Sequence, residues 1–206
     1  MTDHYFSTPD SAEVRRTVQA TIWGRDFSFV TANGVFARDG LDQGTAVLLR
    51  EVAAPTSGER FLDLGCGWGP IASALATVRP EATIDAVDTN ERALALCAAN
   101  ARTAGVADRV HPATPEQLPA EPGHYDQIWS NPPIRIGKPA LHALLLRWLP
   151  TLRPDGVAWL VVGKNLGADS LQRWLRDQDW TCERTASAKG FRILRVSAPC
   201  HSSTAE

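Results

Sequence analysis

Three closely spaced glycines follow an apolar segment, in the stretch Gly65-Cys66-Gly67-Trp68-Gly69. The preceding residues form a candidate buried strand, and Pro70 is typical of the first turn of a helix. Glycine allows a backbone to approach a ligand more closely than any other residue does. A dinucleotide-binding loop has the pattern GxGxxG, whereas the third glycine here comes one position early. The tighter pattern favours a ligand without a pyrophosphate.

Two carboxylates accompany this loop. Asp88 ends a second candidate strand, at roughly the 20-residue spacing expected of a residue that accepts the hydroxyl protons of a ribose. Alternatively, Asp88 caps a helix that begins near Glu91. Beside the glycine loop, ribose binding is the favoured interpretation. Asp63 lies inside the first strand, where a buried carboxylate needs a partner, so we expect it to position the loop or a cofactor amine.

A second motif, Asn131-Pro132-Pro133, follows another candidate strand. Consecutive prolines fix the backbone and lack N–H donors, so carbonyls here can accept, and the Asn131 amide adds an oxygen acceptor. Such a pair can hold both hydrogens of an NH₂ group and orient its nitrogen lone pair toward a sulfonium methyl, a reaction that needs alignment more than acid or base help. An ordinary proline-rich strand exit is the alternative. The position next to the glycine-loop strands favours chemistry.

From about Glu59, short β-branched runs alternate with helical patterns, which is typical of a parallel sheet covered on both faces. The expected strands are Arg60–Leu64, Thr83–Val87, Arg109–His111, Gln127–Ser130, Val157–Val162, Thr181–Arg184 and Phe191–Ser197. The expected helices are Pro70–Val78, Glu91–Ala104, Pro139–Leu149 and Asp169–Gln178. Only a short turn fits before Phe191, so the last two strands should form an antiparallel hairpin. The sequence predicts an α/β, Rossmann-like fold with a seven-stranded, mostly parallel sheet whose last strand is antiparallel.

The residues ahead of Glu59 are expected to form a short lid over the sheet. A polar helix is predicted over Ser11–Ala20, followed by two alternating stretches, Gln19–Trp23 and Asp26–Thr31, and a helix at Gly44–Val52. A length of 206 residues suits one domain. We divide it into an N-terminal extension (1–58), a catalytic core (59–198) and a polar tail (199–206).

Composition narrows the class of protein. The net charge of −2 gives no global argument for a nucleic-acid partner. The cysteines form no CxxC pair and are expected to be free thiols, with no metal site: Cys66, Cys97, Cys182 and Cys200. The chain has no apolar run long enough to cross a membrane and does not begin like a signal peptide, so we expect a cytoplasmic protein without a membrane partner.

The glycine, acidic and Asn-Pro-Pro motifs together resemble those of class I methyltransferases that act on amino groups. Further segments are similar to the small-subunit ribosomal RNA methyltransferase C family: His4–Ser7, Gly34–Ala37, Leu41–Thr45, Ile134–Lys138, Lys164–Ala168 and Lys189–Arg192. The resemblance extends over nearly the whole chain.

This resemblance implies S-adenosylmethionine as methyl donor and the exocyclic N2 of a guanine as acceptor, in ribosomal RNA or in the small ribosomal subunit. It implies the following cofactor contacts: Asp42, Thr45, Asp63, Gly65, Cys66, Gly67, Asp88 and Asn131. Asn131, Pro132 and Pro133 would hold the target amine. Where the family often has an aromatic residue after this motif, the chain has Ile134, which offers apolar contact.

Basic residues follow several strands on the carboxyl side of the predicted sheet. Together with Ile134, the expected substrate contacts are Arg135, Lys138, Lys164 and Lys189, with Arg192 nearby. They would form a track for RNA phosphates. The alternative is that they are ordinary solvated charges.

Other functions remain open on the sequence. A protein glutamine amide N-methyltransferase, or another amino-group methyltransferase, would use the same acceptor pair. A non-catalytic nucleoside-binding module is disfavoured because both motifs are intact. A dehydrogenase is disfavoured by the misplaced third glycine.

Overall fold

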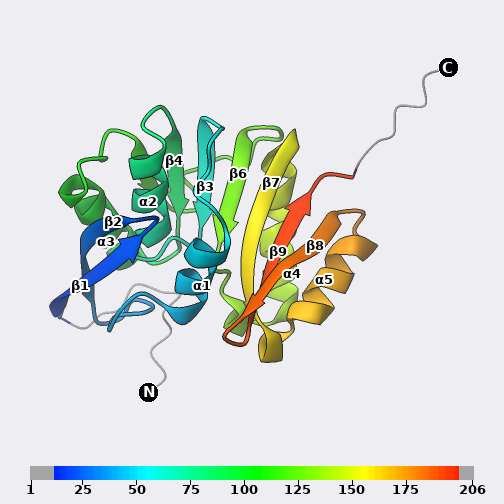
Figure 1. Ribbon diagram of the computed structural model, residues 1–206, viewed down its shortest axis with the longest axis horizontal. Helices are drawn as coiled ribbons and strands as arrows, with labels where there is room; N and C mark the ends of the chain where they lie inside the picture. The colour runs from blue at the N-terminus through cyan, green and yellow to red at the C-terminus, as the bar shows by residue number, and fades with distance from the viewer. Residues whose placement is uncertain (1–11, 200–206) are drawn as a thin grey trace.

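A seven-stranded sheet forms the centre of the structure, a computed structural model that describes residues 12–199 (Figure 1). Its strands are β3 (Arg60–Leu64), β4 (Thr83–Val87), β5 (Val110–Ala113), β6 (Tyr125–Ser130), β7 (Leu152–Gly163), β8 (Thr181–Ala188) and β9 (Phe191–Ser197). They lie in the order β5-β4-β3-β6-β7-β9-β8, and β9 runs in the opposite direction to the other six strands. The predicted fold class is confirmed, with the final strand inserted between β7 and β8.

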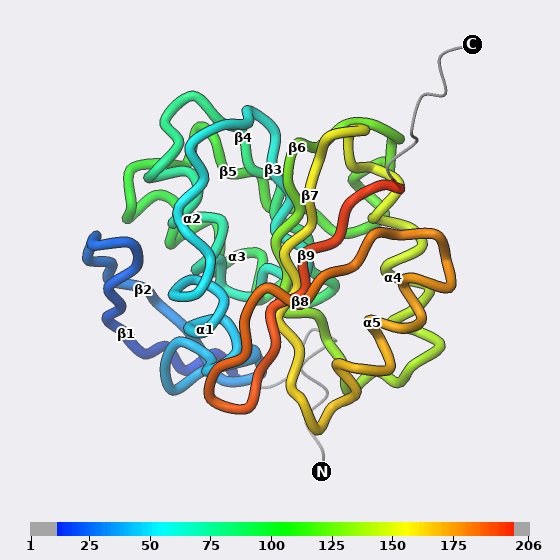
Figure 2. The backbone as a smooth tube through the Cα atoms, turned by 45° about the vertical axis from the view of Figure 1, so that its right-hand side comes forward, coloured from blue at the N-terminus to red at the C-terminus, as the bar shows by residue number. Residues whose placement is uncertain are grey.

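Helices cover both faces of this sheet (Figure 2). They are α1 (Gln43–Glu51), α2 (Pro70–Val78), α3 (Glu91–Thr103), α4 (Lys138–Trp148) and α5 (Ala168–Asp177). Successive strand residues point to opposite faces, so Phe61 of β3 packs in the core under α1, α2 and α3, whereas Leu62 packs in the core under α4 and α5. A strand with apolar residues on both faces reads as a continuous apolar run, which is why β3 was recognisable in the sequence.

The predicted strands and helices of the core are all present; β3, α2, β4 and β9 have the predicted bounds, and the other elements differ at one or both ends. The largest shift is at β7, which begins at Leu152 and not at Val157. Leu152 pairs with Tyr125 across an irregularity in β6, and such irregular pairing leaves no alternating pattern in the sequence.

The predicted helix over Ser11–Ala20 is wrong. Ser11 lies outside the described residues, and residues 15–20 belong to β1 (Arg15–Ile22), which pairs antiparallel with β2 (Arg25–Ala32) in a separate two-stranded sheet. Along β1 the inward residues alternate, with Val18 and Ala20 half-buried and Ile22 buried, while their neighbours are exposed. A period of two specifies a strand, and this period outweighs the polar composition that suggested a helix.

This hairpin packs beside α3, and Trp23 in its turn contacts Trp129 of β6 edge to face, with ring centroids 5.7 Å apart. Asn100 of α3 accepts a hydrogen bond from the Val30 amide at 2.7 Å and donates to the Val30 carbonyl at 2.9 Å. The helix α1 also lies on the sheet, where it packs against β7 and β9. The family-like segment His4–Ser7 and the tail from Cys200 onward lie outside the described residues.

Candidate active site

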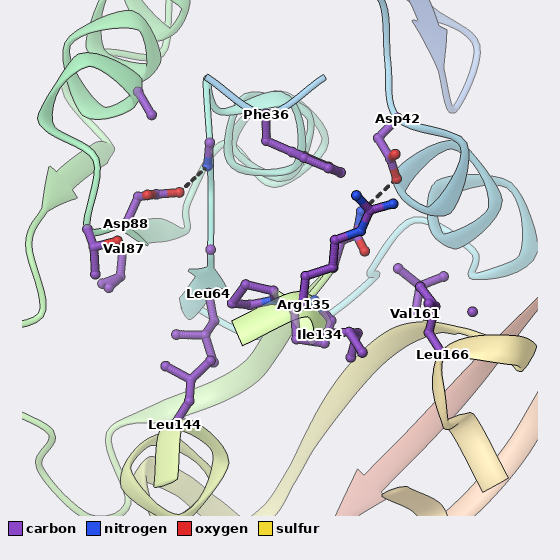
Figure 3. Close-up of a pocket in the computed structure, with 18 of the residues that line it drawn as sticks. Phe36, Asp42, Leu64, Val87, Asp88, Ile134, Arg135, Leu144, Val161 and Leu166 are labelled. Carbon is purple, nitrogen blue, oxygen red and sulfur yellow. Dashed lines mark hydrogen bonds between the residues drawn. The ribbon is translucent and has the colours of Figure 1, made fainter. Parts of the chain in front are cut away.

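A cavity of about 350 Å³ opens at the carboxyl ends of β3, β4 and β6 (Figure 3). Its lining includes the glycine loop, Asp88 and the Asn-Pro-Pro segment, which are far apart in sequence. Asp88 and Asp42 approach from opposite sides, with Phe36 between them. Parallel strands bring their carboxyl ends to one edge of a sheet, so three strand exits converge on a single space.

The glycine loop is fastened to the end of β4. The amides of Gly65 and Cys66 donate to the Val87 carbonyl at 2.8 and 2.9 Å, and the Gly67 amide donates to Asp88 Oδ2 at 2.9 Å. Gly65 and Gly67 have φ values of 77° and 54°, in the left-handed region that favours glycine. A Cβ atom at Gly67 would have no atom within 4 Å, so this backbone faces open space.

Asp88 does not cap α3. The N-cap is Asn90, whose side chain accepts from the amides of Arg92 and Ala93 at 3.0 and 3.2 Å. Asp88 instead accepts from the amides of Gly67 and Asn90 and borders the cavity. Burial raises the pKa of its carboxyl group. The helix-cap alternative considered for Asp88 is therefore excluded.

Asp63 is completely buried beneath the loop and does not line the cavity. Its Oδ2 accepts from the Ala72 amide in the first turn of α2 at 2.9 Å, while its Oδ1 has no hydrogen-bond partner. The side chain fixes the start of α2 and so the exit of the glycine loop. The unpartnered oxygen leaves one hydrogen-bonding position available on the protein side of the loop.

Asp63 makes the stability of the protein depend on pH. Burial raises its pKa from an ordinary 3.8 to about 8. Between these pH values the carboxyl group is protonated in the folded state and ionised in the unfolded state. Its contribution to the free energy of unfolding is therefore full below about pH 4 and is lost as pH rises to about 8, by at most about 1.4 kcal/mol per pH unit. In urea unfolding across this range, Asp63→Asn should remove that decline. Parallel pH profiles of the two proteins would contradict a buried, protonated Asp63.

Asn131 is held by two residues at the start of α1. Its Nδ2 donates to Asp42 Oδ2 at 2.7 Å, the bond drawn as a dashed line at Asp42 in Figure 3, and to Thr45 Oγ1 at 3.1 Å. The end of β6 is also tied to β3, because Ser130 Oγ donates to the Leu64 carbonyl at 2.6 Å. The Asn131 amide therefore has a fixed position at the cavity wall.

The second expected acceptor is already partly used. The Pro132 carbonyl accepts from the Ile134 amide at 2.8 Å, just ahead of the short 3₁₀ turn Ile134–Ile136. A carbonyl oxygen has two lone pairs, so one acceptor position remains. Pro132 is buried and Pro133 half-buried, and both line the cavity.

The remaining predicted residues divide by location. Ile134 and Arg135 line the cavity, and Thr45 and Cys66 line a smaller hollow of about 30 Å³ that shares its Gly65–Gly67 wall. Lys138, Lys164 and Lys189 are exposed and lie outside the cavity lining. The Lys164 amide donates to the Gly190 carbonyl at 2.8 Å, so the turns that carry Lys164 and Lys189 adjoin.

Arg192 is not part of an exposed basic rim. It is buried, and its guanidinium group pairs with Asp169 in the first turn of α5. Arg192 is buried within β9, and a buried charge needs a partner. Because Asp169 is that partner, the guanidinium group is unavailable to a phosphate.

Two aromatic residues of the cavity, Phe36 and Phe191, were missed as site residues in the sequence. Both fall in family-like segments, and that resemblance was the one signal that could have identified them. Phe36 is 47% exposed, an unusual position for a large apolar side chain. Phe191 approaches Gly44, where an added Cβ would lie 3.0 Å from its Cε1 and 3.3 Å from Asn131 Nδ2.

Gly69 joins the loop to α3 by close packing. A Cβ there would lie 2.5 Å from Cys97 Sγ, and its φ is +83°. We expect Gly69→Ala to lower the free energy of unfolding by about 2–4 kcal/mol, from backbone strain and overpacking. Gly67→Ala introduces the same backbone strain but no steric clash, because an added Cβ there meets no atom within 4 Å, and it should lower the free energy of unfolding by about 1–2 kcal/mol.

Urea unfolding measures both changes. Cys97→Ala introduced beside Gly69→Ala should recover part of the loss, because it removes the sulfur that the new methyl group meets. Equal losses for Gly67→Ala and Gly69→Ala would mean that contact with α3 does not limit residue 69.

Three of the four cysteines lie within the described residues. Cys66, Cys97 and Cys182 are free and buried, while Cys200 lies outside the described residues. Within residues 12–199 no cluster of His, Cys, Asp and Glu side chains is arranged for a metal ion. No helix in that range is long and apolar enough to cross a membrane.

Comparison with known proteins identifies relatives along most of the chain. Residues 26–195 match the model of the methyltransferase small domain. The uncharacterized protein YbxB of Bacillus subtilis is 30% identical over 198 residues, covering 95% of this chain and 98% of that protein. The ribosomal RNA small subunit methyltransferase C of Shewanella sp. (strain MR-4) is 40% identical over 104 residues, which cover 50% of this chain and 29% of that enzyme.

A solved structure has a similar fold. The T. thermophilus 16S rRNA N2 G1207 methyltransferase, in complex with AdoMet and guanosine, superposes with a TM-score of 0.79 and 21% identity. The match covers 92% of this chain and 52% of that one. The chain thus spans about half of this structural relative and less than a third of the Shewanella enzyme.

Proposed function

The chain belongs to the methyltransferase small domain family, and we propose that it passes the methyl group of S-adenosylmethionine to the exocyclic N2 amine of a guanine in small-subunit ribosomal RNA. Membership confirms the predicted class of enzyme, an S-adenosylmethionine-dependent methyltransferase. The observation that carries the acceptor assignment is the Asn131 amide, whose nitrogen is bound on the protein side beside the cavity.

The cavity suits the cofactor. Gly65 and Gly67 present bare backbone, and a Cβ added at Gly65 would meet its nearest atoms only at 3.9 Å, so a ligand can approach where a side chain would stand. Asp88 offers carboxylate lone pairs to the hydroxyl groups of a ribose. The Gly65–Gly67 loop and Asp88 would hold the nucleoside part, and the apolar wall at Leu144 would contact its ring.

Alignment is the main contribution of the protein to the reaction. Bound S-adenosylmethionine supplies an electrophilic methyl group on sulfur. Asn131 Oδ1 accepts one hydrogen of the target amine, and a carbonyl of the Asn131–Pro132 segment accepts the other. The nitrogen lone pair is then directed along the path of transfer, and its delocalisation into the ring is reduced. The mostly apolar cavity excludes water that would compete for the amine.

Support for an RNA guanine comes from the relatives and from the cavity mouth. Two of the three relatives described above are ribosomal RNA methyltransferases, one of them in complex with guanosine. Arg135 at the cavity and the exposed Lys138, Lys164 and Lys189 supply positive charge for phosphates, in a chain whose net charge is −2. Phosphate contacts would place the strand, and the cavity would select the base.

The direct test is transfer of a labelled methyl group to three acceptors: ribosomal RNA, assembled small subunits and total protein. We expect label in ribosomal RNA or subunits, recovered after nuclease digestion as N2-methylguanosine, and none with Asn131→Ala. Label recovered only in protein, as methylated glutamine, would refute the guanine assignment. Label in RNA on another atom would refute the N2 assignment while leaving the RNA substrate.

Phe191 is expected to stack on the target base. Ile134 provides no aromatic face, whereas Phe191 lines the cavity and approaches the point above Gly44 that Asn131 also approaches. Stacking of a base on an aromatic side chain contributes about 1–3 kcal/mol, so Phe191→Leu should lower kcat/KM for RNA by about 10- to 100-fold. Phe191→Tyr should retain most of it, and cofactor affinity should not change in either. A normal kcat/KM in Phe191→Leu would exclude stacking by this ring.

A further inference from the structure

Asp42 is a rigid acceptor at the start of α1. Its Oδ2 accepts three hydrogen bonds: from the Gly44 amide at 2.7 Å, from the Thr45 amide at 3.2 Å and from Asn131 Nδ2 at 2.7 Å. The first two are those of a helix N-cap, which fixes the side chain relative to the helix. From this fixed place, Asp42 contacts Asn131, which lies 89 positions later in the sequence.

The chemistry of a carboxylate determines which way the Asn131 amide faces. A carboxylate only accepts hydrogen bonds, so the amide must present its NH₂ group to Asp42. The Thr45 hydroxyl oxygen accepts a second hydrogen bond from the same nitrogen at 3.1 Å, so both hydrogens of the amide have an acceptor on the side of α1. The amide oxygen then faces away from Asp42 and Thr45.

The opposite orientation carries a large penalty. Rotating the amide by 180° would place its oxygen against the Asp42 carboxylate and leave that carboxylate without its third donor. Without Asp42 and Thr45, the two orientations would differ little, and half of the enzyme molecules could present NH₂ to the acceptor. An amine whose own hydrogens meet that NH₂ would be turned away from the methyl donor.

We infer that Asp42 and Thr45 are positioning residues that fix the orientation of the Asn131 amide, and so restrict the enzyme to acceptors that donate N–H hydrogens to Asn131 Oδ1. This inference rests on the proposed amine methylation. It differs from the role implied by the family resemblance, in which Asp42 and Thr45 contact the cofactor. Asp42, the N-cap of α1, decides whether Asn131 presents its oxygen or its NH₂ group to the substrate. With the oxygen presented, the cavity selects substrates that donate a hydrogen bond.

Two substitutions at residue 42 separate positioning from helix capping. Serine is a good N-cap but is too short to reach Asn131 as well, so Asp42→Ser keeps the cap and loses the contact. Asparagine can present its oxygen to the same three donors. We expect Asp42→Ser to lower kcat by about 10- to 100-fold, Asp42→Asn to recover most of that loss, and Thr45→Val to lower kcat by a smaller factor.

Three readouts decide the outcome. The Kd of S-adenosylmethionine should stay within about twofold of the wild-type value, and the midpoint of urea unfolding should stay close to that of the wild type. Neither quantity depends on the orientation of the Asn131 amide. A fall in cofactor affinity that parallels the fall in kcat would overturn the inference and make Asp42 a cofactor ligand. An unchanged kcat in Asp42→Ser would overturn it as well.

A measurement without any substrate separates this inference from the proposed function. In ¹⁵N-edited NMR spectra, the side-chain NH₂ resonances of Asn131, identified by their loss in Asn131→Ala, should be protected from exchange with water in the wild type and unprotected in Asp42→Ser. Protection in a protein that methylates no amine would leave the orientation intact and refute the function. Absence of protection in the wild type would refute the orientation, whatever the enzyme methylates.

Discussion

Replacing Asn131 by alanine is expected to reduce methyl transfer by at least about a thousandfold, while the affinity for S-adenosylmethionine stays close to that of the wild type. In the proposed reaction, Asn131 provides the side-chain acceptor that holds the amine, and alignment is the protein's main contribution. Without it, the amine is left with a carbonyl that already accepts from the Ile134 amide. Single-turnover transfer measures the chemical step, and equilibrium titration measures cofactor binding.

A matched control for this change is Asn165→Ala. Asn165 is exposed in the short turn Lys164–Leu166 and does not line the cavity, so its loss should leave both quantities unchanged. If Asn131→Ala weakened cofactor binding as much as it slowed transfer, Asn131 would serve the cofactor site and not the acceptor. A modest fall of less than about tenfold would mean that backbone carbonyls alone align the amine.

Asp88→Ala is expected to have the largest effect on cofactor binding, a loss of affinity of about 30- to 200-fold. It removes the carboxylate proposed to accept hydrogen bonds from the ribose hydroxyl groups, and charge-assisted hydrogen bonds of this kind contribute about 2–3 kcal/mol. It also frees the Gly67 amide, which now donates to Asp88 Oδ2 at 2.9 Å. Calorimetric titration with S-adenosylhomocysteine measures the change without turnover.

The two effects of Asp88→Ala can be separated by changing the ligand. An analogue of S-adenosylhomocysteine that lacks both ribose hydroxyl groups should bind Asp88→Ala and the wild type with similar affinity, because the contact is already missing. An equal loss for both ligands would mean that Asp88 acts only through the loop. Asp88→Asn keeps an acceptor of the same size and should lose less affinity than Asp88→Ala.

The structure decided between the two interpretations of Asp88. Asp88 was compatible with a helix cap, but α3 begins at Glu91, and the residue next to it is Asn90. The N-cap is the residue immediately before the first helical turn, so an asparagine there competes directly with an aspartate two positions earlier. The structure places the cap at Asn90 and leaves Asp88 at the cavity.

The errors in the N-terminal region arose where local patterns conflict. The stretch from Arg15 to Ile22 is polar and charged, which suggested a solvated helix, yet its few apolar residues recur at every second position. A two-stranded hairpin on the surface buries one face only, so most of its residues remain polar. Where the hairpin docks depends on Asn100 of α3, a contact over 70 residues.

By itself, the sequence determined the parts of the site that depend on local structure. The glycine loop, Asp88 and Asn131 each follow a strand, and parallel strands necessarily bring such residues to the same edge of the sheet. The tertiary structure alone decided which side chains from other elements meet them there. Asp42 reaches Asn131 because α1 packs on β7 and β9, and Phe191 reaches the cavity because β9 is inserted antiparallel beside β7. Local patterns fix the direction and ends of an element, whereas contacts between distant elements depend on packing and strand order, which no short segment encodes.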